Sequence, residues 1–231
     1  MPSFYEFFAG GGMARAGLGK NWECLFANDV DDKKCEIYRA NWGTDELKAK
    51  SITDLRSTDI PRRPDLVWAS FPCQDLSVAG RQAGLKGSRS GTFWSFLRLL
   101  KTLNWEKRAP SVVVLENVCG ALTSHQGRDF GAICGALTGG GYRLGALVVD
   151  AIHFVPQSRP RLFVVGVQEN RIVPPAIISN LPSKLWHPQN LLNAYHGLSR
   201  RIKNGWIWWN LPIPPPRKST MQISFSTNRR V

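Results

Sequence analysis

The chain has 231 residues, of which 43% are hydrophobic and 20% charged, with 30 Lys and Arg against 17 Asp and Glu. This composition excludes a wholly disordered chain, and no apolar run reaches the roughly 18 residues of a transmembrane helix. Five cysteines without a Cys-x-x-Cys pair, and no secretory leader, favour a reduced cytoplasmic protein without a disulfide or metal framework.

Positive charge is concentrated toward the C-terminal end. Residues 1–169 carry 21 basic and 17 acidic side chains, whereas residues 170–231 carry 9 basic and no acidic ones and hold 8 of the 15 prolines. A segment without carboxylates favours contact with a polyanion, and a solvated extension is the alternative. The sequence therefore predicts a balanced domain over 1–169 followed by a basic, Pro- and Trp-rich segment over 170–231.

Six short apolar runs, rich in β-branched and aromatic residues, predict strands that are buried on both faces. They span residues 4–8, 22–27, 66–70, 112–115, 144–149 and 162–167. Segments between them, such as 92–103 and 127–137, carry apolar residues at helical spacing. This alternation predicts an α/β fold with a Rossmann-like, doubly wound, mostly parallel sheet, in which ligands bind beyond the carboxyl ends of the strands.

The first predicted strand is followed by the glycine-rich turn Ala9-Gly10-Gly11-Gly12. Consecutive glycines let the backbone turn tightly and approach a ligand. The turn is not a dinucleotide fingerprint, because its third glycine is replaced by Arg15, and no P-loop Gly-Lys-Ser/Thr follows. Asp29 follows the second strand, where a carboxylate can accept hydrogen bonds from the hydroxyls of a ribose. The glycine-rich turn and Asp29 together indicate an adenosine-containing cofactor without a pyrophosphate. The alternative is a plain tight turn followed by a surface Asp.

Three further strand ends carry reactive or charged side chains. Cys73 follows the third predicted strand on a loop stiffened by Pro72, which fits a nucleophile, although a small buried hydrophobe is the commoner role of cysteine. Glu116 ends the fourth strand, where a charge is costly unless it is paired or used. Arg159 and Arg161 precede the last strand at alternate positions, which points both side chains the same way.

Taken in order, these stretches resemble the DNA (cytosine-5) methyltransferases. The matching motifs are Phe8-Ala9-Gly10-Gly11-Gly12, Pro72-Cys73-Gln74, Glu116-Asn117-Val118 and Gln157-x-Arg159-x-Arg161, within about residues 3–168. The resemblance implies that residues 1–169 form a catalytic domain that binds S-adenosyl-L-methionine and methylates C5 of cytosine in double-stranded DNA. The target base must then be flipped out of the duplex.

The resemblance also implies roles for single residues. Cys73 is the nucleophile that adds to C6 of cytosine, Glu116 acts at N3, and Arg159 and Arg161 hold the O2 side. The implied cofactor-binding residues are Phe8, Ala9, Gly10, Gly12, Asp29, Val30, Ile52, Thr53 and Pro72, and the loop over the base includes Gln74, Ser77, Ser88 and Arg89. The family often has Asp where Ser51 stands, so one adenine contact departs from the pattern.

The resemblance fails at the C-terminal end. Members of the family continue into a target-recognition region and a closing segment, whereas residues 170–231 hold several tryptophans and a Pro-rich run. We interpret them as the connection into, or a remnant of, the recognition region, with an exposed apolar face around 206–209. Three alternatives stay open: a weakly active DNA-binding fragment, half of a split enzyme whose second chain supplies recognition, and a tRNA cytosine-5 methyltransferase.

Overall fold

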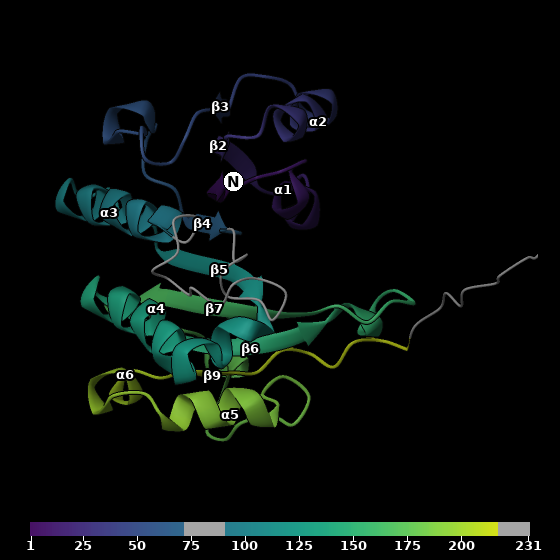
Figure 1. Cartoon of the computed structure of the whole chain (residues 1–231), viewed down its shortest axis with the longest axis vertical. Coiled ribbons are helices and arrows are strands. Elements are labelled where there is room, and N and C mark those ends of the chain that lie inside the picture. Colours follow the sequence, from purple (N-terminus) through teal and green to yellow (C-terminus); the bar gives the residue numbers. More distant parts are fainter. Residues whose placement is uncertain (72–90, 217–231) are drawn as a thin grey trace, which may run out of the picture.

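The computed structural model describes residues 1–71 and 91–216 of the chain (Figure 1). Six residues that the sequence predicts for the site lie outside the described residues: Pro72, Cys73, Gln74, Ser77, Ser88 and Arg89. In the described part of the chain, no helix has both the length and the apolar content that crossing a membrane requires.

Seven strands form one sheet in the order β3-β2-β1-β4-β5-β7-β6 (Figure 1). They are β1 (Ser3–Phe7), β2 (Glu23–Asp29), β3 (Leu47–Ala49), β4 (Leu66–Ala69), β5 (Val112–Val118), β6 (Tyr142–Asp150) and β7 (Pro160–Gln168). β7 is antiparallel to both β5 and β6, and the other neighbours are parallel. The predicted Rossmann-like, mostly parallel α/β sheet is confirmed. Of these seven strands, only β3 was not predicted from the sequence, because three residues are too few to show a pattern.

Two long helices, α3 (Gly91–Trp105) and α4 (Arg128–Gly139), cover one side of the sheet, which we call the front face. The side chains of Phe96 and Phe130 on these helices are fully buried, as are Phe7, Val113 and their neighbours on the strands. Burial of this many large apolar side chains is the main source of stability in such a domain. The front face is therefore the principal core of the molecule.

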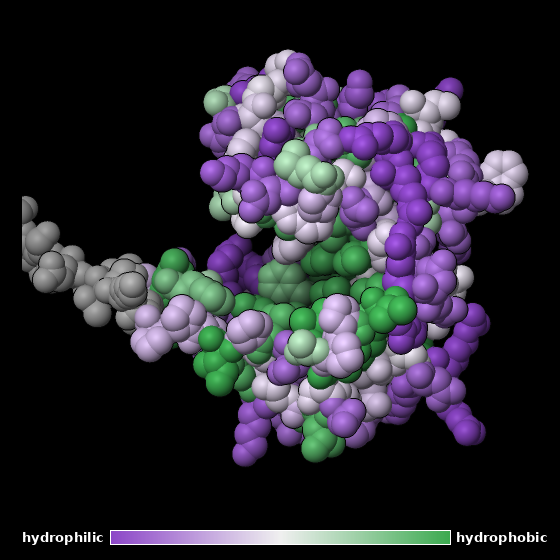
Figure 2. Space-filling view, turned by 180° about the vertical axis from the view of Figure 1, so that it is seen from behind, coloured by the Kyte–Doolittle hydropathy of each residue, from purple (hydrophilic) through white to green (hydrophobic). Residues whose placement is uncertain are grey.

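The opposite side, the back face, is covered at its two ends. The helices α1 (Met13–Leu18) and α2 (Asp32–Trp42) pack at the end formed by β1, β2 and β3. At the other end, the small two-stranded antiparallel sheet of β8 (Ile178–Ser179) and β9 (Trp208–Trp209) packs against β6 and β7. Between these covers, Trp68, Phe163 and Val165 are only half-buried. Figure 2, which shows this side, has apolar side chains gathered in a hollow across the middle.

Residues 173–211 pack directly onto the sheet. The backbone N–H of Val148 donates to the carbonyl of Trp186 at 2.8 Å, and that of Ile207 donates to Leu144 at 2.8 Å. Ile207 and Trp209 are 4% and 5% exposed. The expected exposed apolar face around 206–209 is therefore wrong, because β9 turns these side chains against β6.

Two helices, α5 (Gln189–His196) and α6 (Arg200–Asn204), precede β9; α6 contacts α4, and α5 contacts β6. Short 3₁₀ turns complete the connections: Ser57–Asp59, Cys119–Leu122, Ser124–Gly127, Ala151–His153 and Pro175–Ile177.

Candidate functional site

A cavity of about 670 Å³ opens on the back face at the carboxyl ends of β1, β4 and β5. Six residues that the sequence predicts for the site line it together: Phe8, Ala9, Gly10, Glu116, Arg159 and Arg161. They come from three separate segments of the chain, which the strand order brings to one edge of the sheet. This is the edge at which doubly wound folds bind their ligands.

The glycine turn has a strained backbone that the surrounding side chains determine. Phe8, Gly10 and Gly12 all have positive φ angles, of 57°, 56° and 82°. A Cβ atom on Gly12 would lie 2.2 Å from Nε1 of Trp42, so only glycine fits there. At Gly10 a Cβ would meet no atom within 4 Å. The backbone at Gly10 is therefore open to a ligand.

The Asp29 carboxylate holds this turn from the end of β2. Its Oδ2 accepts the backbone N–H of Gly10 at 2.9 Å, and its Oδ1 accepts the N–H groups of Val30 and Asp31. The next segment lies alongside, because the N–H of Lys50 donates to the carbonyl of Asp29 at 3.1 Å. Asp29 therefore joins the turn to the segment that leads into Ile52.

Five predicted cofactor residues in the described part of the chain do not line the cavity, namely Gly12, Asp29, Val30, Ile52 and Thr53. The Val30 side chain is 65% exposed, whereas Ile52 is 4% exposed and belongs to the front core. The Thr53 hydroxyl is 2.8 Å from that of Ser51. The cavity therefore joins the glycine turn to Glu116, Arg159 and Arg161. The residues predicted for the ribose and adenine lie outside its wall.

Glu116 and Arg161 form an ion pair at the cavity wall. Arg161 Nε lies 3.1 Å from Glu116 Oε1, and their side chains are 21% and 24% exposed. β5 continues to Val118 and pairs with β7, so the two side chains project from neighbouring strands onto the back face. Each charge is therefore neutralised by the other in the free chain.

Asp150 fixes the loop that carries Arg159 and was missed by sequence reasoning. Its carboxylate accepts the backbone N–H groups of Ile152 and Arg159, the latter at 2.7 Å, and the hydroxyl of Ser158. These hydrogen bonds hold the pKa of Asp150 below its usual value. The signal was present in the sequence, since Asp150 follows an apolar run (144–149), just as Glu116 follows the run 112–115.

A second missed residue, Glu6, places a buried carboxylate in the cavity wall. Glu6 is 2% exposed, and its two oxygens accept the N–H groups of Ala14 and Arg15 at the start of α1, at 2.9 and 3.2 Å. Burial raises the pKa of Glu6 to about 7. An acidic residue within an apolar strand was the signal that could have found it.

The described cysteines have thiols that are poorly suited to nucleophilic attack. Burial raises the pKa values of Cys24, Cys35, Cys119 and Cys134 above that of a free thiol. Since the thiolate is the nucleophilic form, these four are mostly protonated at neutral pH. Residues 1–71 and 91–216 also contain no group of three or more side chains that could hold a metal ion.

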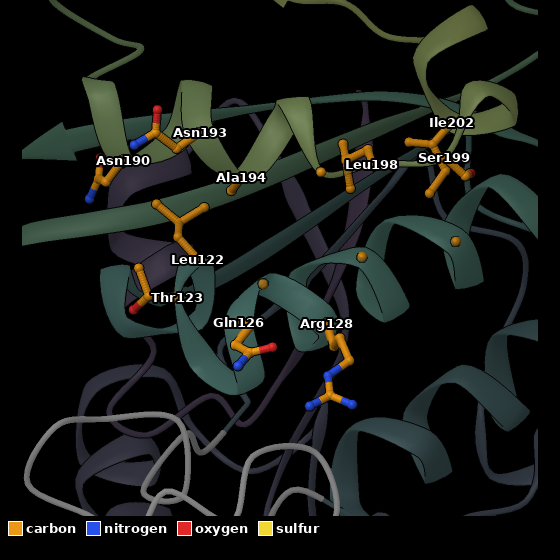
Figure 3. Close-up of a pocket in the computed structure, with 14 residues that line it drawn as sticks. Leu122, Thr123, Gln126, Arg128, Asn190, Asn193, Ala194, Leu198, Ser199 and Ile202 are labelled. Carbon is orange, nitrogen blue, oxygen red and sulfur yellow. The ribbon is translucent and has the colours of Figure 1, made fainter.

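A second cavity, also about 670 Å³, lies between α4 and α5 (Figure 3). Its rim is polar, with Gln126 and Arg128 on one side and Asn190 and Asn193 on the other. Gln126 belongs to a left-handed turn before α4 and has a φ angle of 60°. None of the residues that the sequence predicts for the site lines this cavity.

Comparison with known proteins gives consistent matches. The family model for C-5 cytosine-specific DNA methylases matches residues 3–206. The type II methyltransferase M.BsuFI of Bacillus subtilis is 36% identical over 166 residues, which cover 71% of this chain and 39% of that protein. M.NgoFVII of Neisseria gonorrhoeae is 29% identical over 99% of this chain and 58% of its own length. The chain therefore spans about half the length of these relatives.

Among solved structures, the Dnmt2 methyltransferase of S. pombe aligns with a TM-score of 0.60 and 23% identity. The alignment covers 75% of this chain and 53% of that one. At this identity the likeness concerns the fold, and it agrees with the sheet described above.

Proposed function

Because the chain belongs to the family of C-5 cytosine-specific DNA methylases, we propose that it transfers a methyl group from S-adenosyl-L-methionine to C5 of cytosine in double-stranded DNA. One observation carries the proposal: a single cavity joins the glycine turn to Glu116, Arg159 and Arg161. These are the parts that binding a nucleoside cofactor and activating a base require, and they are adjacent.

The residues present fit this cofactor. The backbone at Gly10 is open to a ligand, and the buried carboxyl group of Glu6 lies in the wall, where a sulfonium cation would favour its ionised form. When bound, S-adenosyl-L-methionine supplies an electrophilic methyl group. Phe8, Ala9 and Gly10 would hold its methionine part, while Asp29, Val30, Ile52 and Thr53 would serve the ribose and adenine from beside the cavity.

Cytosine C5 is a weak nucleophile, so the chain must activate it. The Cys73 thiolate would add to C6, and the electron pair of the C5–C6 bond would move toward C5. C5 would then form the bond to the methyl group, while the electron pair of the broken methyl–sulfur bond would stay on the donor's sulfur. A base removes the C5 proton, the C5–C6 double bond reforms, and Cys73 leaves as thiolate. The raised pKa values of the four described cysteines support this assignment to Cys73.

Glu116 and the arginines would stabilise the charge that develops on the ring. Glu116 would take up a proton from water when the ion pair opens and would donate it, or a hydrogen bond, at N3, while Arg161, with Arg159 beside it, would contact O2. In the free chain Arg161 contacts Glu116 instead. Entry of the flipped base therefore exchanges the ion pair for contacts with the ring, which makes binding and activation one event.

We also propose that a second chain, which supplies target recognition, completes the enzyme. Mostly parallel sheets are normally covered on both faces, but Trp68, Phe163 and Val165 are half-buried on the back face. The relatives are longer than this chain. By itself the chain should bind S-adenosyl-L-methionine weakly, which calorimetry measures, and should methylate DNA with little sequence preference. We place this activity in the cytoplasm.

A trapping experiment tests the chemistry. Duplex DNA containing 5-fluorocytosine should form a covalent complex in the presence of S-adenosyl-L-methionine, because fluorine at C5 cannot leave as a cation. Cys73→Ala should abolish the complex, and Cys119→Ala, the matched control, should keep it. An adduct that survives Cys73→Ala refutes the assignment. Comparing methyl transfer to duplex DNA and to tRNA decides between the two polymers.

A further inference from the structure

The solvent-exposed side of α3 carries two tryptophans and two cations. Trp94, Arg98, Lys101 and Trp105 follow one another at intervals of four, three and four residues, which places them on one side of a helix. Trp105 is 86% exposed and Trp94 is 44% exposed, and both cations are exposed. We call these four residues the α3 stripe.

The other side of α3 already provides the packing that the fold needs. Six apolar side chains of the helix are buried in the front core: Phe93, Phe96, Leu97, Leu99, Leu100 and Leu103. The helix is therefore anchored without the stripe. A tryptophan left 86% exposed buries little of its large apolar surface, and such residues are enriched where proteins bind partners.

The charge on α3 is of one sign. The helix contains no Asp or Glu, and within residues 1–71 and 91–216 neither Arg98 nor Lys101 lies within ion-pair distance of a carboxylate. By contrast, the exposed side of α2 mixes Lys33 and Lys34 with Asp32 and Glu36. The stripe thus attracts anions, whereas α2 does not favour either sign.

We propose that the α3 stripe binds single-stranded nucleic acid, with bases stacked on Trp94 and Trp105 and phosphates on Arg98 and Lys101. Exposed rings between cations are the arrangement that such strands require, because each nucleotide offers an aromatic face and an anion. A duplex would offer its phosphates but not its stacked bases. A protein partner would need acidic groups to match the cations.

The dimensions suit a short length of strand. The two tryptophans are eleven positions apart, which is about 16 Å along an α-helix. If the strand keeps the base spacing of a duplex, about 3.4 Å, this distance corresponds to roughly five nucleotides, within the usual footprint of such sites. α3 begins at the carboxyl edge of the sheet because it connects two parallel strands, β4 and β5. The Trp94 end therefore faces the edge that carries the cavity.

Binding of a fluorescein-labelled single-stranded DNA of 20 mixed nucleotides tests the proposal by anisotropy, with the full chain and no cofactor. Trp105→Ala should weaken binding about 5- to 150-fold, the range of one base–aromatic stack, and Trp105→Phe should restore most of the loss. Removing both cations, Arg98→Ala with Lys101→Ala, should reduce the slope of log K against log salt by about 1.4. Lys33→Ala with Lys34→Ala on α2 is the matched control and should change neither quantity.

Three results would overturn the proposal. The first is an unchanged affinity of Trp105→Ala, with a melting curve like that of the parent chain. The second is an equal loss of affinity of Trp105→Ala for a duplex of the same sequence. The ring would then not stack on unpaired bases, because a duplex does not offer them. The third is a parent chain that forms a dimer, which Trp105→Ala dissociates without a change in DNA affinity. The α3 stripe would then bind a second copy of the chain. The experiment needs no methyl transfer, so a failure of the proposed activity does not affect it.

Discussion

The two faces of the sheet differ in how their apolar side chains are covered, and adjacent residues of β7 show the difference. Val164 points to the front face and is 2% exposed beneath the helices, whereas Val165 points to the back face and is half-buried. Front-face positions of β1, β4 and β5 carry no charge, but the back face holds Glu6 and Glu116. The front face therefore provides stability, and the back face provides the cavity and its charges.

The incomplete cover of the back face has a chemical use. A cavity needs room next to the strands, and charged side chains need partners or water to remain ionised. Glu116 has Arg161 as its partner, whereas Glu6 accepts the backbone N–H groups that begin α1 and, because it is buried, keeps its proton up to about pH 7. The same surface that makes the site accessible also leaves Trp68 and Phe163 half-buried.

The largest expected effect is on the rate of methyl transfer. Glu116→Gln should lower it roughly 10²- to 10⁴-fold, the usual contribution of a general acid. It should change the free energy of unfolding by no more than about 1 kcal/mol, because water still reaches this half-buried ion pair. Glu46→Gln is a matched control, because it breaks the Arg15–Glu46 pair outside the cavity, at 3.2 Å and similar exposure. A loss of rate below tenfold would make Glu116 a structural residue.

A substitution on the front face should instead lower the free energy of unfolding. Phe96→Ala removes a fully buried ring that contacts Phe7 at a centroid distance of 5.2 Å. It should lower the free energy of unfolding by about 3–5 kcal/mol, through lost burial and the cavity left behind. Urea denaturation measures this, and a loss near 1 kcal/mol would show that the helix repacks. Trp105→Ala, which removes an exposed ring from the same helix, should stay within about 0.5 kcal/mol.

The buried carboxylate of the back face should make stability depend on pH. The unfolded chain releases the Glu6 proton near pH 4.5, whereas the folded chain keeps it up to about 7. The contribution is therefore fully present below pH 4.5 and is lost as the pH rises to about 7, by about 3 kcal/mol in total. Denaturation at several pH values should show this decline, and Glu6→Gln should remove it. Glu36→Gln, on the exposed side of α2, should keep the parent profile.

The smallest effect compares the two neighbours in β7 directly. Val164→Thr buries a hydroxyl in the front core and should cost about 1–3 kcal/mol of unfolding free energy. Val165→Thr places the same group on the half-buried back face and should cost no more than about 0.5 kcal/mol. Equal losses, measured in urea, would mean that the back face is already covered. Addition of a completing partner should raise the cost at Val165 alone.

The amino-acid sequence determined the features that depend on neighbours along the chain. Runs of β-branched and aromatic residues specified six of the seven strands, and the spacing of apolar residues specified α3 and α4. The order of the motifs around Gly10, Cys73, Glu116 and Arg161 determined the family. These signals are readable because periodicity and residue order are local properties.

Only the tertiary structure decided which of these residues share a cavity. The insertion of β7 between β5 and β6 places Arg161 against Glu116, and the start of α1 over β1 gives Glu6 its hydrogen bonds. Packing against β6 likewise buried Trp209, which sequence reasoning had left exposed. Burial and charge pairing arise from contacts between residues far apart in the sequence. No local pattern contains that information, because it exists only after the strands have been ordered in space.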